Sequence, residues 1–315
     1  MTGAPYASLS PDRVLASLAA VGLEPDGRLL ALNSFENRVY QVGIEDAAPV
    51  VAKFYRPARW SDAAIAEEHA FALELADAEL PVVAPLVIDG ATLHHVEGFR
   101  VAVYPRRGGR APTLESADHL AWMGRLIARI HAVGARARFA SRGAIDLDAF
   151  LYGASAAVLA SPLLPDGLDR RYRAAVEALA APLASAFSHA SACTLRLHGD
   201  CHPGNVLWTD HGPHFVDLDD ARTGPAVQDL WMLAPDRHAL DLLLEGYTEF
   251  RDFDYGEIAL IEPLRLMRQV HWAGWIAARW GDPAFPAAFA HVGEPRWWEQ
   301  HVGDLAEAAR ALNDP

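Results

Sequence analysis

The chain has 315 residues, of which 51% are apolar and 22% charged, an ordinary globular composition that argues against a disordered, collagen-like or coiled-coil protein. The net charge of −14 disfavours nucleic acid and anionic membranes as partners, although it would attract a cationic substrate. No apolar run is long enough to span a membrane, the first 20 residues lack a signal-peptide pattern, and two cysteines make no disulfide framework, so a cytoplasmic protein is expected.

The first third of the chain predicts a helix followed by a strand-rich unit. Ser10 and Pro11 form a helix start, with a capping side chain and a proline at the first helical position. Ser61 is expected to cap a second helix over residues 63–77. The predicted strands cover residues 29–44 with a polar turn inside, then 49–55, 82–88, 92–96 and 99–104.

From residue 105 onward the pattern becomes helical. Helices are predicted from about 120 to a stop at Gly134 and then over 168–189, 227–250, 256–280 and 302–312, with a single strand pair at 205–217. This order predicts an α+β chain with two lobes, an antiparallel-sheet lobe over 1–104 and a mostly helical lobe over 105–315. A ligand site is expected in the cleft between such lobes.

The densest group of reactive residues is LRLHGDCHPGNVLWTDHGPHFVDLDDA. A hairpin turn centred on His211 would pair residues whose numbers add to 422, which places Asn205 opposite Asp217. An amide oxygen and a carboxylate are hard ligands of the kind that Mg²⁺ prefers. Asp200 precedes Asn205 by five residues, the spacing of a kinase catalytic loop in which the Asp accepts the hydroxyl proton of the substrate. Asp219 is a weaker candidate in the same segment.

A zinc site is the alternative interpretation of this segment, because four histidines and a cysteine also lie in it. Pro203 and Gly204 argue against the helix that a His-x-x-x-His pair would need, and oxygen ligands outnumber soft ones. We therefore expect His198 to pack beneath the loop and bond its backbone, and Cys201 to fill space.

Lys53 is the only lysine among the 27 lysine and arginine residues. It lies in the middle of a predicted strand, from which an ammonium group could hold the phosphates of ATP, as the strand lysine of protein kinases does. Such a lysine needs a carboxylate partner, and the following helix offers Glu67 and Glu68, of which Glu68 is favoured. No G-x-G-x-x-G motif precedes Lys53, so a polar turn containing Ser34 is expected to cover the phosphates instead.

HGDCHPGN followed by VDLDDA resembles the catalytic core of the aminoglycoside phosphotransferase/choline kinase superfamily, which has a two-lobed protein-kinase-like fold. Segments across nearly the whole chain, among them LNSFENRVYQV, VVAKFYRPARW and VYPRRGGR, are similar to its bacterial stress-response kinases. The resemblance implies a cytoplasmic, monomeric serine/threonine protein kinase that uses ATP and Mg²⁺. It also implies that Asp200 and Asp217 are catalytic, that Asn205 and Asp217 bind the metal, that Ser34 contacts ATP and that Asp229 braces the loop.

Two other functions stay open at this point. Residues 218–228 are too few for a long activation loop, and this favours a small-molecule kinase acting on an aminoglycoside, choline or a sugar. Five late tryptophans, at 272, 275, 280, 297 and 298, are compatible with an aromatic cage for an ammonium group, although helix packing is the expected role. A non-catalytic pseudokinase is disfavoured because Lys53, Asp200, Asn205 and Asp217 are all present.

Overall fold

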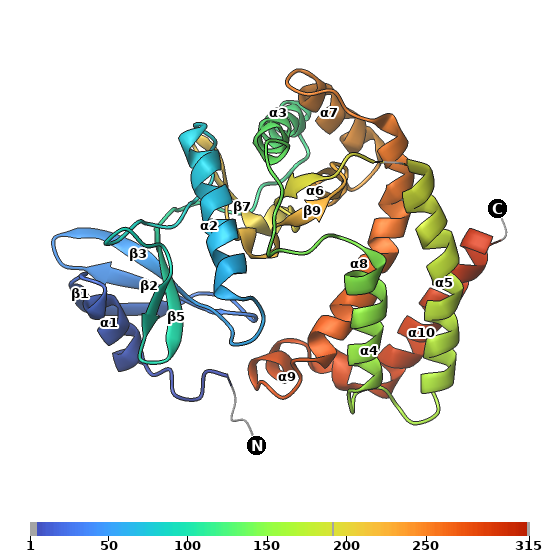
Figure 1. The fold of residues 1–315 in the computed structure, drawn as a ribbon, viewed down its shortest axis with the longest axis horizontal. Coiled ribbons are helices and arrows are strands. Elements are labelled where there is room, and N and C mark those ends of the chain that lie inside the picture. Colours follow the sequence, from blue (N-terminus) through green and yellow to red (C-terminus); the bar gives the residue numbers. More distant parts are fainter. Residues whose placement is uncertain (1–4, 191, 314–315) are drawn as a thin grey trace. The chain divides into compact units, whose positions relative to one another are not determined.

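A computed structural model of the protein describes residues 5–190 and 192–313. The chain forms two compact units (Figure 1). The first unit comprises Met1–Arg142, Leu195–Thr223 and Asp229–Phe253, and the second comprises Gly143–Thr194, Gly224–Gln228 and Asp254–Pro315. The boundary expected at residue 104 falls within the first unit, so the division into lobes of 1–104 and 105–315 stays a prediction.

The first unit contains a five-stranded antiparallel sheet with the strand order β1-β2-β3-β5-β4. Its strands are β1 (Pro25–Ala31), β2 (Arg38–Ile44), β3 (Ala47–Phe54), β4 (His94–Val96) and β5 (Phe99–Pro105). The stretch 82–88, predicted as a strand, makes only isolated bridges at Val82 and Ile88. Pro85 lies within it and has no N–H to donate to a ladder, which explains why no strand forms there.

Two helices of this unit begin where the sequence predicts. The side chain of Ser10 accepts a hydrogen bond from a backbone N–H in the first turn of α1 (Pro11–Ala20), at 3.3 Å. Ser61 does the same at 3.1 Å for α2 (Asp62–Asp77). Both caps satisfy N–H groups that the helix itself leaves without a partner.

The two faces of the sheet pack against different helices. Ala52 and Phe54 of β3 belong to the apolar cluster that includes residues of α1. Tyr55 lies in a second cluster with Ile65 of α2. Because successive side chains of a strand point to opposite faces, Lys53 lies on the α2 side of the sheet.

The hairpin after the catalytic segment has a register that differs from the predicted one by one residue. β7 (Val206–Thr209) and β8 (Gly212–Phe215) pair so that Val206 faces Phe215, and partner numbers add to 421 instead of 422. The turn contains two residues rather than three, because Gly212 already pairs with Thr209. The prediction that Asn205 pairs directly with Asp217 is therefore wrong, and Asn205 instead bonds Val216 through its carbonyl at 3.0 Å.

A second short strand pair, β6 (Leu195–Leu197) with β9 (Arg222–Gly224), was not predicted from the sequence. The remaining helices that lie wholly or mainly in the first unit are α3 (Ala117–Gly134), α6 (Gln228–Trp231) and α7 (Arg237–Thr248). The predicted helix over 227–250 is interrupted near Pro235, which cannot donate to a continuing helix. Asp236 caps the new start at α7.

α3 and α7 approach each other closely through two glycines. A Cβ on Gly124 would lie 1.9 Å from the carbonyl oxygen of Leu243, and one on Gly246 would lie 2.0 Å from that of Ala121. Only a residue without a side chain permits this backbone contact.

The second unit is helical where the structure describes it. It contains a π-helix (Asp148–Gly153), α4 (Ala154–Leu159), α5 (Asp169–Ala190), a 3₁₀ helix (Tyr255–Leu260), α8 (Ile261–Ala277), α9 (Ala284–Ala288), a short 3₁₀ turn (Ala290–Gly293) and α10 (Pro295–Asn313). Trp298 is fully buried and donates to the carbonyl of Val292 at 2.9 Å, while Trp272, Trp275 and Trp297 contact other aromatic rings. These contacts confirm the expected packing role for four of the five late tryptophans. No helix in the described ranges combines the length and apolar character needed to cross a membrane.

Candidate active site

The Asp-x-x-x-x-Asn spacing forms a compact loop in the structure. After His202 the chain turns through a 3₁₀ helix at Pro203–Asn205, and the His202 side chain caps it by accepting from the N–H of Gly204 at 3.0 Å. This turn places the amide nitrogen of Asn205 2.9 Å from the carbonyl oxygen of Asp200 and 3.4 Å from its carboxylate. Because the amide nitrogen is used as a donor, the amide oxygen of Asn205 is the atom left to act as a metal ligand.

A buried carboxylate holds the start of this loop. Asp229, from α6, accepts hydrogen bonds from the backbone N–H groups of His198 and Gly199, at 2.8 and 2.9 Å. The ring of His131 in α3 bridges Asp229 and the hydroxyl of Tyr247 in α7, at 3.2 and 3.0 Å. This arrangement confirms that Asp229 braces the loop, and it connects the brace to two helices.

The loop also packs closely against the segment that follows β8. Gly199 has a φ of +84°, and a Cβ at this position would lie 2.1 Å from the carbonyl oxygen of Asp220. His198 is buried and donates from Nε2 to the carbonyl of Val216 at 3.0 Å, so the backbone that it bonds belongs to the segment after β8 and not to the loop as predicted. Cys201 is buried, and burial raises the pKa of its thiol well above the ordinary value, with Asp229 and Asp200 adding to the shift. Its surroundings fit a space-filling role better than a nucleophilic one.

Asp217 occupies a left-handed backbone conformation directly after β8, with φ 60° and ψ 62°. The side chain of Asp217 is 55% exposed. Because the N–H of Val216 bonds the carbonyl of Asn205, the residue opposite Asn205 is Val216, and Asp217 follows it by one position. Within residues 5–190 and 192–313 no three His, Cys, Asp or Glu side chains are arranged to hold a metal ion together. A carboxylate and an amide oxygen nonetheless suit Mg²⁺, which takes one or two protein ligands and completes its shell with phosphate oxygens and water.

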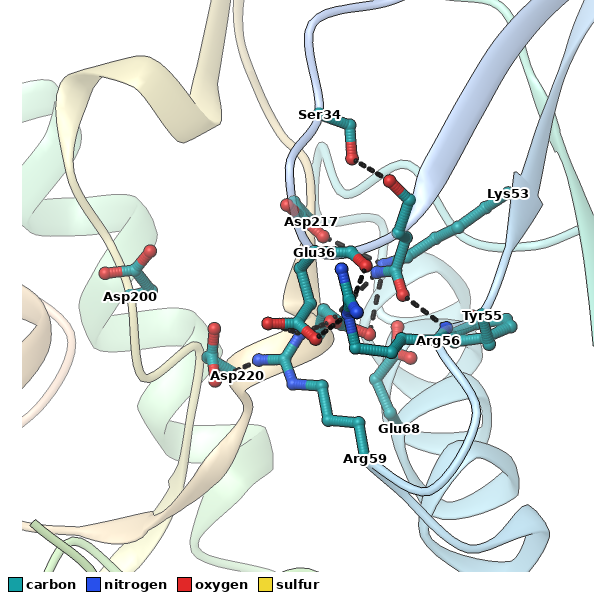
Figure 2. A network of polar contacts seen from close by, with 12 residues as sticks. Ser34, Glu36, Lys53, Tyr55, Arg56, Arg59, Glu68, Asp200, Asp217 and Asp220 are labelled. Carbon is teal, nitrogen blue, oxygen red and sulfur yellow. Dashed lines mark hydrogen bonds and ion pairs between the residues drawn. The ribbon is translucent and has the colours of Figure 1, made fainter. Parts of the chain in front are cut away.

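Lys53 reaches two carboxylates of the segment after β8 (Figure 2). Its Nζ lies 2.9 Å from Oδ1 of Asp217 and 3.2 Å from Oδ1 of Asp219, and 5.2 Å above the ring of Tyr55. Burial alone would lower the pKa of Lys53, but Asp217 and Asp219 raise it well above its ordinary value. The lysine is therefore a buried cation that stays protonated.

The predicted pairing of Lys53 with a carboxylate of α2 is not what the structure contains. Glu68 is buried, and among the described residues its Oε2 accepts no hydrogen bond and lies 3.9 Å from Nε2 of His69. Burial raises the pKa of Glu68 to about 7, although Lys53 and Arg142 act to lower it. Glu67 points elsewhere and accepts from three backbone N–H groups of residues 140–142, at 2.7, 2.8 and 3.0 Å. The carboxylates after β8, rather than those of α2, are the direct partners of Lys53.

The polar turn between β1 and β2 is held by its own side chains and by Asp219. Ser34 donates to the carbonyl of Asn37 at 3.0 Å, which shapes the turn. The amide of Asn37 donates to Oδ2 of Asp219 at 3.1 Å and accepts from the N–H of Arg56 at 3.0 Å. The turn predicted to cover the phosphates is thus tied to the segment that carries Asp217, while a contact of Ser34 with ATP stays a prediction.

Asp219 and Arg59 are the site residues that sequence reasoning undervalued or missed. Arg59 forms ion pairs with Asp219 and, at 2.7 Å, with Asp220, and lies 4.0 Å from Glu36. Burial acts to raise the pKa of Asp219, but Arg59 and Lys53 outweigh it and hold the value at about 2. One more arginine in a chain that uses arginine at 26 of its 27 Lys and Arg positions gives no signal in the sequence.

The fold and these residues define a kinase-like phosphotransferase, and comparison with known proteins agrees. Residues 28–261 match the model of the phosphotransferase enzyme family, and the chain belongs to this family. It is 43% identical to stress response kinase A of Escherichia coli K12, over 98% of this chain and 95% of that protein. It is 42% identical, with the same coverage, to the serine/threonine protein kinase RdoA of Salmonella typhimurium LT2.

A solved structure shows the same fold at much lower sequence similarity. The complex of amicoumacin kinase hAmiN with AMP-PNP, Ca²⁺ and Ami superposes with a TM-score of 0.73 at 16% identity, covering 94% of this chain and 93% of that one. The predicted fold class, a small antiparallel sheet with a helical remainder of the aminoglycoside-phosphotransferase type, is therefore confirmed. The chain is a phosphotransferase of a fold that uses ATP and usually a divalent metal ion.

Proposed function

We propose that this protein is a serine/threonine protein kinase that transfers the γ-phosphate of ATP to a protein hydroxyl with the help of Mg²⁺. The observation that carries the proposal is the 43% identity with stress response kinase A, which extends over 98% of the chain and is not confined to the catalytic motif. The arrangement of Lys53, Asp200, Asn205 and Asp217 in one unit supports it, because each group needed for phosphoryl transfer is present.

Each of these side chains has a role that follows from its surroundings. Lys53 would hold phosphate oxygens, since it is a permanent buried cation on the sheet. Asn205 and Asp217 would hold Mg²⁺, which neutralises phosphate charge when bound. Asp200 would accept the proton of the attacking hydroxyl, and the bonds from Asn205 and the brace at Asp229 keep its loop in place.

A small-molecule kinase on the same fold is the second candidate. The observation in its favour is the short stretch between Asp217 and Asp229, residues 218–228, which begins with a 3₁₀ turn at Leu218–Asp220 and continues into β9. This stretch has no room for a long activation loop, so an acceptor site would need no loop rearrangement to open. The acidic net charge of −14 would also suit a cationic small molecule.

Transfer of labelled phosphate from ATP separates the two candidates. The purified protein is incubated with Mg²⁺ and labelled ATP, once with a protein extract and once with a panel of aminoglycosides, choline and sugars. Asp200→Asn serves as the control that keeps the fold but lacks the proton acceptor. Label on serine or threonine of proteins, absent with the control, supports the proposal; label on a small molecule alone would contradict it.

The other expectations about partners and state rest on the same similarity and on the net charge of −14. We propose a monomer with no nucleic-acid partner, and the cytoplasmic location expected from the sequence stays a prediction. Sedimentation of the purified protein with and without ATP tests the first of these.

A further inference from the structure

Asp219 is a buried carboxylate on which three separate elements of the first unit converge. Its side chain is only 4% exposed. It contacts Lys53 of β3 at 3.2 Å, Asn37 of the turn between β1 and β2 at 3.1 Å, and Arg59 of the loop before α2. Its backbone carbonyl also accepts from the guanidinium of Arg142. No other carboxylate in the described site contacts Lys53, the turn between β1 and β2 (the covering turn) and the loop before α2 together.

Glu68 stands in contrast to Asp219 although the two carboxylates are equally buried. It lies on α2, the element that carries the partner of the strand lysine in protein kinases. Among the described residues Lys53 forms ion pairs with Asp217 and Asp219 and none with Glu68. Oε2 of Glu68 and Oδ1 of Asp219 both lack a hydrogen bond there, so the two carboxylates differ in the ion pair with Lys53.

We infer that Asp219, rather than Glu68, is the positioning residue that fixes Lys53 and the covering turn for the triphosphate. The inference deepens the proposed function and rests on it for the role of Lys53. It concerns only how this chain holds its own residues, so it can be tested in the nucleotide-free protein.

Asp217 and Asp219 are assigned different roles because their side chains differ in exposure. Asp217 is 55% exposed and is the proposed Mg²⁺ ligand, so its oxygens would bind the metal ion during the reaction. Asp219 is enclosed, and Arg59 and Asn37 hold the oxygen that does not face Lys53. Lys53 therefore keeps one fixed partner while its contact with Asp217 is exchangeable. An ammonium group has three donors and can keep the Asp219 contact while it binds phosphate.

Because Lys53 is the only lysine, its chemical reactivity can be read without interference from other lysines. An amine-acylating reagent labels Lys53 and the α-amino group, and peptide mapping by mass spectrometry separates the two. In the nucleotide-free protein, Asp219→Asn should raise the labelling rate of Lys53 roughly tenfold or more. Asp219→Asn removes one of the two carboxylates that hold the ammonium group, so the side chain is less confined and meets the reagent more often.

Three further variants make the experiment specific. Glu68→Gln should raise the labelling rate of Lys53 less than Asp219→Asn does, since Glu68 acts on Lys53 only through its charge and forms no ion pair with it among the described residues. Asp304→Asn, on an exposed position of α10, is the matched control and should label like wild type. The double variant Asp219→Asn/Arg59→Gln removes both members of a buried ion pair, which avoids a lone buried charge should Asp219→Asn fold poorly. It should show the same rise.

Steady-state kinetics supply a second readout. Asp219→Asn should raise KM for ATP and lower kcat together, whereas the KM of Glu68→Gln for ATP should stay close to wild type. Wild-type labelling of Lys53 in Asp219→Asn and in the double variant, or an equal rise in Glu68→Gln, would overturn the inference. Failure to phosphorylate proteins would instead contradict the proposed function, and the labelling result would stand independently of it.

Discussion

The buried carboxyl of Glu68 predicts a specific dependence of stability on pH. Burial raises its pKa from 4.5 to about 7 in the folded protein, while in the unfolded chain the value returns to about 4.5. Between these two pH values the folded state binds a proton that the unfolded state has lost. The stabilisation is therefore complete below about pH 4.5 and disappears as the pH rises through 7.

The size of the effect follows from the same two values. A difference of about 2.5 pH units corresponds to about 3 kcal/mol of unfolding free energy, at about 1.4 kcal/mol per unit. Glu68→Gln removes the titrating group and keeps its shape. The variant should gain about 3 kcal/mol relative to wild type between pH 5 and pH 8, because only the wild type must ionise a buried carboxyl.

Urea unfolding at pH 5, 6, 7 and 8 measures this difference. Other groups that titrate in the range are common to both proteins, so their contributions cancel in the comparison. Glu307→Gln, at an exposed position of α10, is the matched control and should differ from wild type by the same amount at every pH. A Glu68→Gln variant that behaves like this control would show that Glu68 ionises normally, and the argument from burial would be wrong.

Four more predictions concern the site. Asp200→Asn should fold normally and lose roughly 10²–10⁴ of its phosphoryl transfer rate, the usual contribution of a general base; a rate within a few-fold of wild type would refute the assignment. Asp217→Ala and Asn205→Ala should each raise the Mg²⁺ concentration needed for half-maximal activity, with the larger change at Asp217 because a charge is lost, and unchanged titrations would argue against this metal pair. Lys53→Arg should keep its melting temperature but lose most ATP turnover, since a planar guanidinium needs a different approach to phosphate; full turnover would mean that the lone lysine is an accident of composition. Gly199→Ala forces a side chain onto a φ of +84° and to 2.1 Å from a carbonyl oxygen, so it should cost more than about 2 kcal/mol in urea unfolding and lower activity, whereas wild-type stability would show that the loop can shift.

Much of the site could be predicted from the sequence because it is encoded over a few consecutive residues. The spacing of Asp200 and Asn205 closes into one short turn, and the cap at Ser61 starts α2 one residue before the predicted helix. The strand position of Lys53 and the brace at Asp229 also agree with the pattern. Each of these features depends on local backbone geometry, which neighbouring residues largely determine.

The tertiary structure decided what depends on residues far apart in the chain. A turn of two residues or of three is compatible with TDHGP, so the sequence left the register of β7 and β8 open by one residue. The partner of Lys53 was likewise undetermined, because Glu68 and the aspartates at 217 and 219 all offer the same carboxylate chemistry. Which of them meets the ammonium depends on how the sheet, α2 and the segment after β8 pack, and Asp219 lies 166 residues beyond Lys53. The types of residues along the chain do not show which residues 166 positions apart lie close in space. Only the folded chain therefore shows that Lys53 pairs with the carboxylates after β8.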